Sequence, residues 1–319
     1  MNIATGKEIP LISLGLIAYN HETYIADCLK SILSQDYENL ELVILDDASS
    51  DNTLNIIEKY IPKLEKKFKK LHLIKHNKNV GNIPKNYNMI LKKITSEFFF
   101  SVSGDDIILS NTVTVLYTNL VSHPECAVIH ANGIYIDENF HFGDLPDKSQ
   151  LLHIGKETAV EPSSFFKQLM CRCIIYRPSV MMRTKLFNKY GYHNETLAFE
   201  DYEYWLRIAL ENEKFFYLNE VVVLYRRANS SYTNFNSNNG IKKLRDTIDF
   251  DYKSKKIYIN KLTKDEVKRC WEAFYNDFLY HINNSNNCTS LIPYLDSLVK
   301  KENYSYLIND YKKNITRLN

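Results

Sequence analysis

The chain has 319 residues, of which 45% are hydrophobic, so it is long enough to bury a sizeable core in one large domain or two smaller ones. Its 40 Lys and Arg residues nearly balance its 38 Asp and Glu residues, and this gives no reason to expect a nucleic-acid partner. No stretch approaches the roughly 18 to 20 apolar residues of a membrane span. Glu8 and Pro10 interrupt the region where a secretory signal would be apolar, so we expect a cytoplasmic protein.

Strand and helix patterns alternate through the first part of the chain. Apolar runs without helical spacing predict strands buried on both faces, and apolar residues at positions i, i+3, i+4 and i+7 predict amphipathic helices. The predicted strands are residues 11–18, 40–45, 71–75, 98–103 and 127–136, and the predicted helices are 25–33, a segment around 56–60, a segment near 85–93, and 112–121. Right-handed crossovers then bring the carboxyl ends of the first strands to one sheet edge.

The segment 137–156 contains Gly143, Pro146 and Gly155 but has no clear period, which is typical of a functional lid or a mobile loop. The predicted elements that follow are a helix at 163–170, a strand at 179–182, a helix at 200–211 and a strand at 216–225. The Asn- and Ser-rich stretch after Tyr225 predicts a loop or linker. The rest of the chain is mostly helical, and its apolar face favours packing onto the main domain over a partner or membrane surface.

Three acidic sites lie at the ends of predicted elements. Asp46 and Asp47 follow the second strand, Asp105 and Asp106 follow the fourth, and a further acidic pair opens the helix at 200–211. Adjacent carboxylates repel each other unless a cation or a hydrogen-bond donor lies between them, and oxygen ligands suit Mg²⁺ or Mn²⁺. For the Gly-Asp-Asp turn alone, the competing interpretation is a solvated turn.

Five motifs occur in order: ISLGLIAYNHETYIADCLKSILSQ, ELVILDDASSDNT, HNKNVGN, FFFSVSGDD and AFEDYEYWLRI. Together they resemble the GT-A glycosyltransferases of family 2, inverting enzymes that transfer a sugar from a nucleotide donor. The resemblance covers residues 11–227 and implies an α/β fold with a Rossmann-like, mostly parallel central sheet flanked by helices. It also implies a catalytic domain at 1–227, with a nucleotide-binding half at about 1–106 and an acceptor half at about 107–227, followed by a mostly helical region at 228–319.

The resemblance implies a donor site along the sheet edge. Tyr19 would stack on the nucleobase, although a core tyrosine is the alternative. Asp47 matches the Asp that accepts hydrogen bonds from uracil, which indicates a UDP-sugar, although Asp47 would otherwise cap the following helix. Lys85 stands where many relatives carry an Arg near the nucleotide, and its alternative is a solvated side chain.

In the acidic turn, the resemblance implies that Asp105 and Asp106 bind a divalent metal, Mn²⁺ or Mg²⁺, with Asp105 also contacting the nucleotide-sugar. The metal would neutralise the diphosphate as negative charge builds on the leaving group. Ser103 stands where the family usually has an Asp, so metal affinity would be lower than in relatives with the usual pattern.

Glu200 and Asp201 match the family motif in which the Asp acts as general base on the acceptor hydroxyl. Asp201 is therefore the predicted catalytic residue, with Glu200 and Arg226 on the acceptor side. The alternative is that both acids complement the positive end of the helix dipole.

The implied activity is transfer of a single hexose or N-acetylhexosamine from a UDP-sugar to a glycan or lipid-linked oligosaccharide, in O-antigen, lipooligosaccharide or capsule assembly. The C-terminal region would associate peripherally with the inner face of the membrane. One alternative is a noncatalytic sugar-nucleotide-binding or scaffold protein with a decayed metal site. A nucleotidyltransferase is a second, but such enzymes open with a Gly-rich, basic phosphate loop that LGLIAYNHET lacks.

Overall fold

The computed structural model describes residues 9–152, 158–160, 162–228, 234–237, 239–285 and 288–309. Parts of the predicted loop at 137–156 and of the predicted linker after Tyr225 lie outside these residues. The chain forms two units. The first contains Met1–Val160, Ile175–His193 and Glu213–Arg226, and the second contains Glu161–Ile174, Asn194–Asn212 and Arg227–Asn319. The predicted domain boundary at residue 227 stays a prediction.

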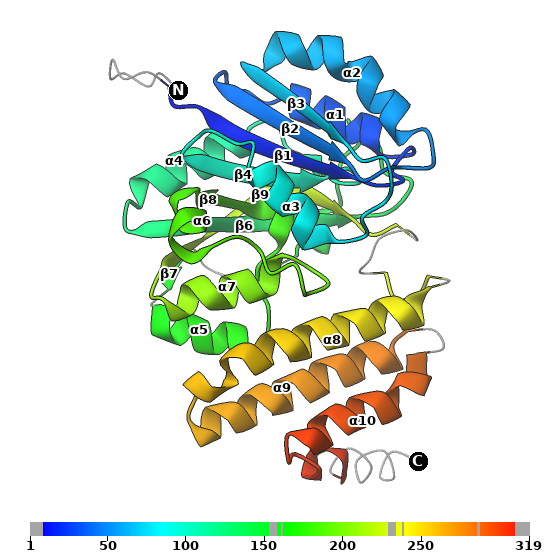
Figure 1. Ribbon diagram of the computed structural model, residues 1–319, viewed down its shortest axis with the longest axis vertical. Helices are drawn as coiled ribbons and strands as arrows, with labels where there is room; N and C mark the ends of the chain where they lie inside the picture. Colours follow the sequence, from blue (N-terminus) through cyan, green and yellow to red (C-terminus); the bar gives the residue numbers. More distant parts are fainter. Residues whose placement is uncertain are drawn as a thin grey trace. The chain divides into compact units, whose positions relative to one another are not determined.

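The first unit is built on a mixed β-sheet (Figure 1). Its strands are β1 (Ile12–Ala18), β2 (Leu40–Asp46), β3 (Lys70–Lys75), β4 (Phe98–Ser103), β5 (Ile107–Ile108), β6 (Cys126–Ile136), β7 (Thr158–Val160), β8 (Val180–Arg183) and β9 (Lys214–Arg226). They follow the order β3-β2-β1-β4-β8-β6-β9-β5, with β7 paired to β9. The pairs among β3, β2, β1 and β4 are all parallel, whereas β8 pairs antiparallel with both β4 and β6.

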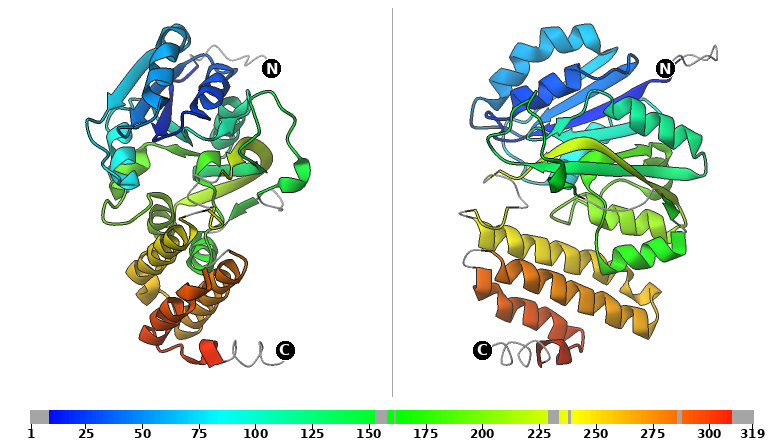
Figure 2. Two further views of the ribbon diagram at one scale, coloured as in Figure 1. Left: turned by 90° about the vertical axis from the view of Figure 1, so that its right-hand side faces the viewer. Right: turned by 180° about the vertical axis from the view of Figure 1, so that it is seen from behind.

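Helices cover both faces of this sheet, as the views from the side and from behind make clear (Figure 2). The helices of the first unit are α1 (Ile25–Leu33), α2 (Thr53–Lys67), α3 (Ile83–Leu91), α4 (Thr112–Ser122) and α6 (Lys185–Tyr190). Apolar residues of α1, α2 and α4 share one core with alternate residues of β1, β2 and β4. Because side chains alternate along a strand, the residues between them face α3 and α6 on the other side.

Gly15, in the middle of β1, allows a close approach on that second face. A Cβ atom at this position would lie 3.0 Å from Ile90 Cγ2 on α3 and 3.0 Å from Phe99 Cε2 on β4. Since this is tighter than ordinary van der Waals contact, the absence of a side chain lets α3 pack directly on the central strand.

The second unit is helical. Its helices are α5 (Pro162–Cys171), α7 (Asp201–Leu210), α8 (Gly240–Tyr258), α9 (Lys264–Asn283) and α10 (Ile292–Lys301). Trp271, Phe274 and Phe278 of α9 lie in a core shared with α8 and α10. This apolar face is therefore buried within the helical unit itself, whereas the sequence favoured packing onto the main domain. Thr263 begins α9 with a capping box, in which its side chain and that of Glu266 satisfy each other's backbone N–H groups.

The predicted elements agree closely with those observed. The helix predicted at 25–33 is α1, the strand predicted at 179–182 is β8, shifted by one residue, and the helix predicted at 200–211 is α7. The short elements β5, β7 and α6 were not predicted, because two to six residues carry no measurable period. Within the described residues, no helix is both long enough and apolar enough to span a bilayer.

A buried carboxylate ties the amino ends of the parallel strands together. Glu41 on β2 accepts hydrogen bonds from the Ser13 hydroxyl on β1 and, at 2.5 Å, from the backbone N–H of Thr95 just before β4. Burial alone would raise the pKa of Glu41, but these hydrogen bonds and the Lys70 ammonium hold it below the ordinary value. Glu41 thus stabilises the strand arrangement in its ionised form.

We predict that Glu41→Gln lowers the free energy of unfolding at pH 7 by about 1 to 3 kcal/mol, because the amide leaves buried donors unpaired. A carboxyl with a lowered folded-state pKa stabilises above its unfolded-state pKa and loses that contribution as pH falls through the folded-state value. The wild type should therefore lose stability below about pH 4.5 more steeply than the variant. Urea unfolding across this range measures both effects.

Lys70→Met is the matched control, since the Lys70 ammonium lies 3.9 Å from Glu41 and is half exposed. It should change stability by less than about 1 kcal/mol. Equal acid sensitivity in the wild type and the Glu41 variant would contradict the assignment.

Candidate functional site

Three chain turns meet at the carboxyl edge of the parallel strands. β1 lies between β2 and β4, with Ala18 opposite Asp46 and Ile17 opposite Ser103. The backbone continues these ladders beyond the strands: Asp47 N–H donates to the Ala18 carbonyl at 3.0 Å, and Gly104 N–H donates to the Ile17 carbonyl at 2.8 Å. This is the edge at which open α/β sheets bind ligands.

The turns after β1 and β2 are hydrogen-bonded to each other. Asn20 has a positive φ of 54°, its N–H donates to Ser49 Oγ at 3.0 Å, and its side-chain oxygen accepts from Ser50 N–H at 2.8 Å. These two hydrogen bonds hold the Ala-Tyr-Asn turn in one conformation. Tyr19 is 43% exposed, which excludes the core-tyrosine alternative.

Asp47 joins β2 to the loop before α3. Its carboxylate is buried and accepts from Val80 N–H at 2.8 Å and from Gly81 N–H at 3.1 Å. The alternative role of capping α2 does not apply, because it is Asp51 that accepts from Thr53 N–H. Asp47 therefore organises the HNKNVGN segment.

Lys85 is the third residue of α3, the helix that begins directly after that segment. Asn82 caps the helix by accepting from Lys85 N–H at 2.8 Å, and the Lys85 side chain is exposed. The cap places this cation at the same end of the sheet as Asp47. No described residue forms an ion pair with it.

The two aspartates of the Ser-Gly-Asp-Asp turn have different environments. Asp106 is 1% exposed, its N–H donates to the Ser103 carbonyl at 3.2 Å, and its Oδ1 accepts from Arg226 N–H at 2.9 Å. Its other carboxylate oxygen is buried without a hydrogen-bond partner among the described residues. Burial, together with the charge of Asp105, raises the pKa of Asp106 well above the ordinary value. This turn is not simply solvated.

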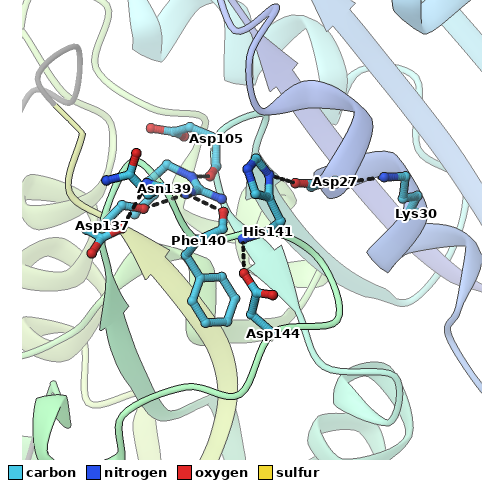
Figure 3. A network of polar contacts seen from close by, with 9 residues as sticks. Asp27, Lys30, Asp105, Asp137, Asn139, Phe140, His141 and Asp144 are labelled. Atoms are coloured by element: carbon cyan, nitrogen blue, oxygen red, sulfur yellow. Dashed lines mark hydrogen bonds and ion pairs between the residues drawn. The ribbon is translucent and has the colours of Figure 1, made fainter.

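Asp105 is only partly buried, and its backbone carbonyl accepts from Arg226 Nε at 2.8 Å. Its carboxylate points away from these hydrogen bonds (Figure 3). Among the described residues, no three His, Cys, Asp or Glu side chains converge as a complete metal cage. A partly exposed carboxylate such as that of Asp105 nevertheless suits Mg²⁺ or Mn²⁺, which commonly bind one or two carboxylates and complete their coordination with phosphate oxygens and water.

His21 was not among the predicted site residues. Its Nδ1 is buried against the acidic turn without a hydrogen-bond partner in the described part of the chain. A Cβ atom at Gly104 would lie 2.6 Å from that nitrogen, so the glycine makes room for the imidazole. Gly104 in the acidic motif was the sequence signal for a close approach. Its partner, His21, could not be identified because it lies 83 residues away in the sequence.

Glu200 and Asp201 belong to the second unit, where they begin α7. Glu200 is buried, and Asp201 Oδ1 accepts from Tyr202 N–H at 2.7 Å. The position at the first turn is compatible with the helix-dipole alternative and with a base role, and both remain predictions. The first unit brings together Tyr19, Asp47, Asp105, Asp106 and Arg226 at its sheet edge.

The sequence profile described as Glycosyl transferase family 2 matches residues 13–181, about half of the chain. A Haemophilus influenzae protein described as an uncharacterized glycosyltransferase is 31% identical over 307 residues, covering 90% of this chain and 86% of that protein. The glycosyltransferase GlyG of Streptococcus pneumoniae is 25% identical over 224 residues, covering 69% of this chain and 72% of GlyG.

Solved structures share the fold. S. aureus TarS 1–349, crystallised with UDP-GlcNAc, superimposes with a TM-score of 0.58 at 21% identity, covering 95% of this chain and 92% of that one. The mannosyltransferase PcManGT of Pyrobaculum calidifontis, in complex with GDP-Man and Mn²⁺, gives a TM-score of 0.55 at 14% identity, covering 96% and 87%. The expected α/β architecture with helical extension is thus confirmed. With the profile match and the Haemophilus relative, the chain belongs to glycosyl transferase family 2 and is a glycosyltransferase of the GT-A fold.

Proposed function

We propose that this glycosyltransferase takes a single hexose or N-acetylhexosamine from a UDP-sugar and transfers it, with inversion, to a glycan acceptor. The observation that carries the donor half of the proposal is the common edge of β2, β1 and β4, where Tyr19, Asp47 and Asp105 follow adjacent strands. This arrangement supports an extended nucleotide-sugar site, with the aromatic ring of Tyr19 after one strand and the carboxylates of Asp47 and Asp105 after its two neighbours.

Tyr19 and Asp47 would bind the base. The exposed ring of Tyr19 offers a stacking surface, worth about 1 to 3 kcal/mol per base. Each Asp47 oxygen accepts one backbone hydrogen bond and has a second lone pair, so the carboxylate retains acceptor capacity for the N–H of uracil. Lys85 would add a positive charge near the phosphates.

Asp105 would hold a divalent cation. When bound, the cation would offset the negative charge that builds on the departing diphosphate. The contrast in environments favours Asp105 over Asp106, since Asp106 is buried and already bonded to Arg226 N–H. That PcManGT was solved with Mn²⁺ and GDP-Man supports metal use in this fold, and TarS was solved with UDP-GlcNAc.

Asp201 would act as general base on the acceptor hydroxyl, with Glu200 on the acceptor side. Arg226, expected there from the sequence, is instead buried and hydrogen-bonded to the acidic turn. Direct displacement at the anomeric carbon needs such a base because an alcohol is a weak nucleophile until its proton is being removed. We place the acceptor in O-antigen, lipooligosaccharide or capsule assembly, where a lipid-linked oligosaccharide would bring the enzyme to the inner face of the membrane.

A donor screen tests the proposal. Release of UDP or GDP is measured with UDP-glucose, UDP-galactose, UDP-GlcNAc and GDP-mannose, with and without Mn²⁺, over a panel of glycan acceptors. We expect turnover with at least one UDP-sugar. Turnover restricted to GDP-mannose would contradict the uracil assignment, and nucleotide binding without turnover on any pair would contradict the proposed donor and acceptor classes.

Asp201→Asn should lower kcat by about 100- to 10,000-fold, because the amide cannot accept the acceptor's proton. UDP affinity, measured by calorimetry, should remain unchanged. Glu211→Gln, at the exposed end of the same helix, is the control and should keep full activity. Near-normal transfer by a folded Asp201 variant would show that another group is the base.

Asp105→Asn should raise the Mn²⁺ concentration needed for half-maximal donor binding by about tenfold or more, because the amide is a weaker ligand for a hard cation. Asp106→Asn retains an oxygen that can accept from Arg226 N–H, so metal dependence should shift by less than about threefold. Equal shifts in the two variants would indicate that both side chains bind the metal.

A further inference from the structure

Arg226, the last residue of β9, is a fully buried cation, with 1% of its surface exposed. Its Nε donates to the Asp105 carbonyl at 2.8 Å, and its Nη1 donates to the carbonyls of Asp137 at 2.6 Å and Phe140 at 2.9 Å. The guanidinium carbon lies 4.5 Å from the centre of the Tyr24 ring, at the start of α1. Burying a charge is costly, so these hydrogen bonds are needed for the side chain to stay inside.

The hydrogen bonds of Arg226 join segments that are far apart in sequence. Its backbone N–H holds the Asp106 carboxylate, while its side chain holds the carbonyl of Asp105 and two carbonyls just after β6. A planar guanidinium has several donors in a fixed geometry, which a lysine ammonium cannot reproduce. The acidic turn and the segment 137–140 are therefore tied to one rigid group.

The same segment has a second attachment further along. His141 Nδ1 lies 3.1 Å from Asp27 Oδ2 on α1, and Asp27 also pairs with Lys30 at 2.9 Å. His141 N–H donates to Asp144 Oδ2 at 2.7 Å, which closes a turn through Gly143 at φ +107°. Figure 3 shows the two attachments side by side, one at Asp105 and one at Asp27.

Residues beyond these attachments are exposed. Phe142 is 39% exposed and Leu145 is 95% exposed, so the segment presents apolar side chains to solvent from a base fixed by polar contacts. Hydrogen bonds at its base, rather than apolar burial at its tip, hold this segment in place.

We infer that Arg226 is a positioning residue, which fixes the direction of the Asp105 carboxylate and couples the acidic turn to the segment 137–144. This rests on the proposed donor site, because Asp105 is the group through which Arg226 acts. When the turn binds a cation and diphosphate, the carbonyls of Asp137 and Phe140 are held in place by the same guanidinium. Conversely, breaking the hydrogen bonds between Arg226 and the segment frees the turn, whereas losing the distal attachment at His141 does not.

The test compares Arg226→Gln and Arg226→Lys with His141→Ala in the full-length protein. Hydrogen exchange is measured without ligand. Both Arg226 variants should exchange faster in peptides covering 103–108 and in peptides covering 137–142, because the shared group is lost. His141→Ala removes only the distal attachment and should accelerate exchange in 139–144 while leaving 103–108 unchanged. Faster exchange at 137–142 alone in the Arg226 variants would overturn the coupling.

Calorimetry with UDP and Mn²⁺ separates positioning from general destabilisation. In Arg226→Lys, UDP affinity without metal should stay within about twofold of the wild type, while the gain in affinity caused by Mn²⁺ falls by about tenfold. A purely structural role would lower both affinities together or neither, and either result would overturn the inference. If Arg226→Gln does not fold, Arg226→Lys carries both measurements.

The two experiments distinguish a failure of the positioning role from a failure of the proposed function. If the wild type binds no UDP and no Mn²⁺, the donor-site proposal fails, and the exchange experiment still reports whether the turn and the segment are coupled. If the wild type binds both and the Arg226 variants respond to Mn²⁺ as the wild type does, the donor site stands and the positioning role is wrong.

Discussion

The parallel pairing of β1 with both β2 and β4 is the constraint on which the site depends. The register sets Ala18 against Asp46 and Ile17 against Ser103, so the three following turns begin at the same height. Glu41 fixes the opposite ends of these strands through Ser13 and Thr95. If one strand slipped by one residue, its side chains would exchange the two faces of the sheet, and the turns would no longer meet. The geometry of the donor edge is thus a property of the sheet.

Asp105 and Asp106 have different roles in our proposal because the fold buries one of them more than the other. Asp106 is buried and bonded to Arg226 N–H, and burial disfavours its ionised form. Asp105 is partly exposed, and its backbone carbonyl accepts from the Arg226 guanidinium. A single acidic motif therefore supplies one carboxylate that shapes the turn and one that faces outward. Because position 103 is a serine and adds no carboxylate to the turn, our proposal assigns the metal chemistry to Asp105.

The parallel half of the sheet could be predicted from the sequence because its strands and helices each carry a local pattern. Apolar runs marked β1, β2 and β4, and helical spacing marked α1. The hydrogen bonds of the Arg226 side chain could not be predicted, since their partners lie 86 to 121 residues away and are backbone carbonyls, which carry no side-chain signature. Asp47 was expected either to cap a helix or to bind the base. Its hydrogen bonds to Val80 N–H and Gly81 N–H could not be predicted, because they also join residues that are far apart in sequence.

Gly104 and His21 form a complementary pair of a missing side chain and a large one. Neither position can enlarge alone, because the imidazole occupies the space into which any Cβ at 104 would project. Substitution at these two positions should therefore be correlated through descent: lineages with a side chain at 104 would carry a smaller or differently directed residue at 21. His21 and Gly104 would then evolve as a pair contributed by the turns that follow β1 and β4.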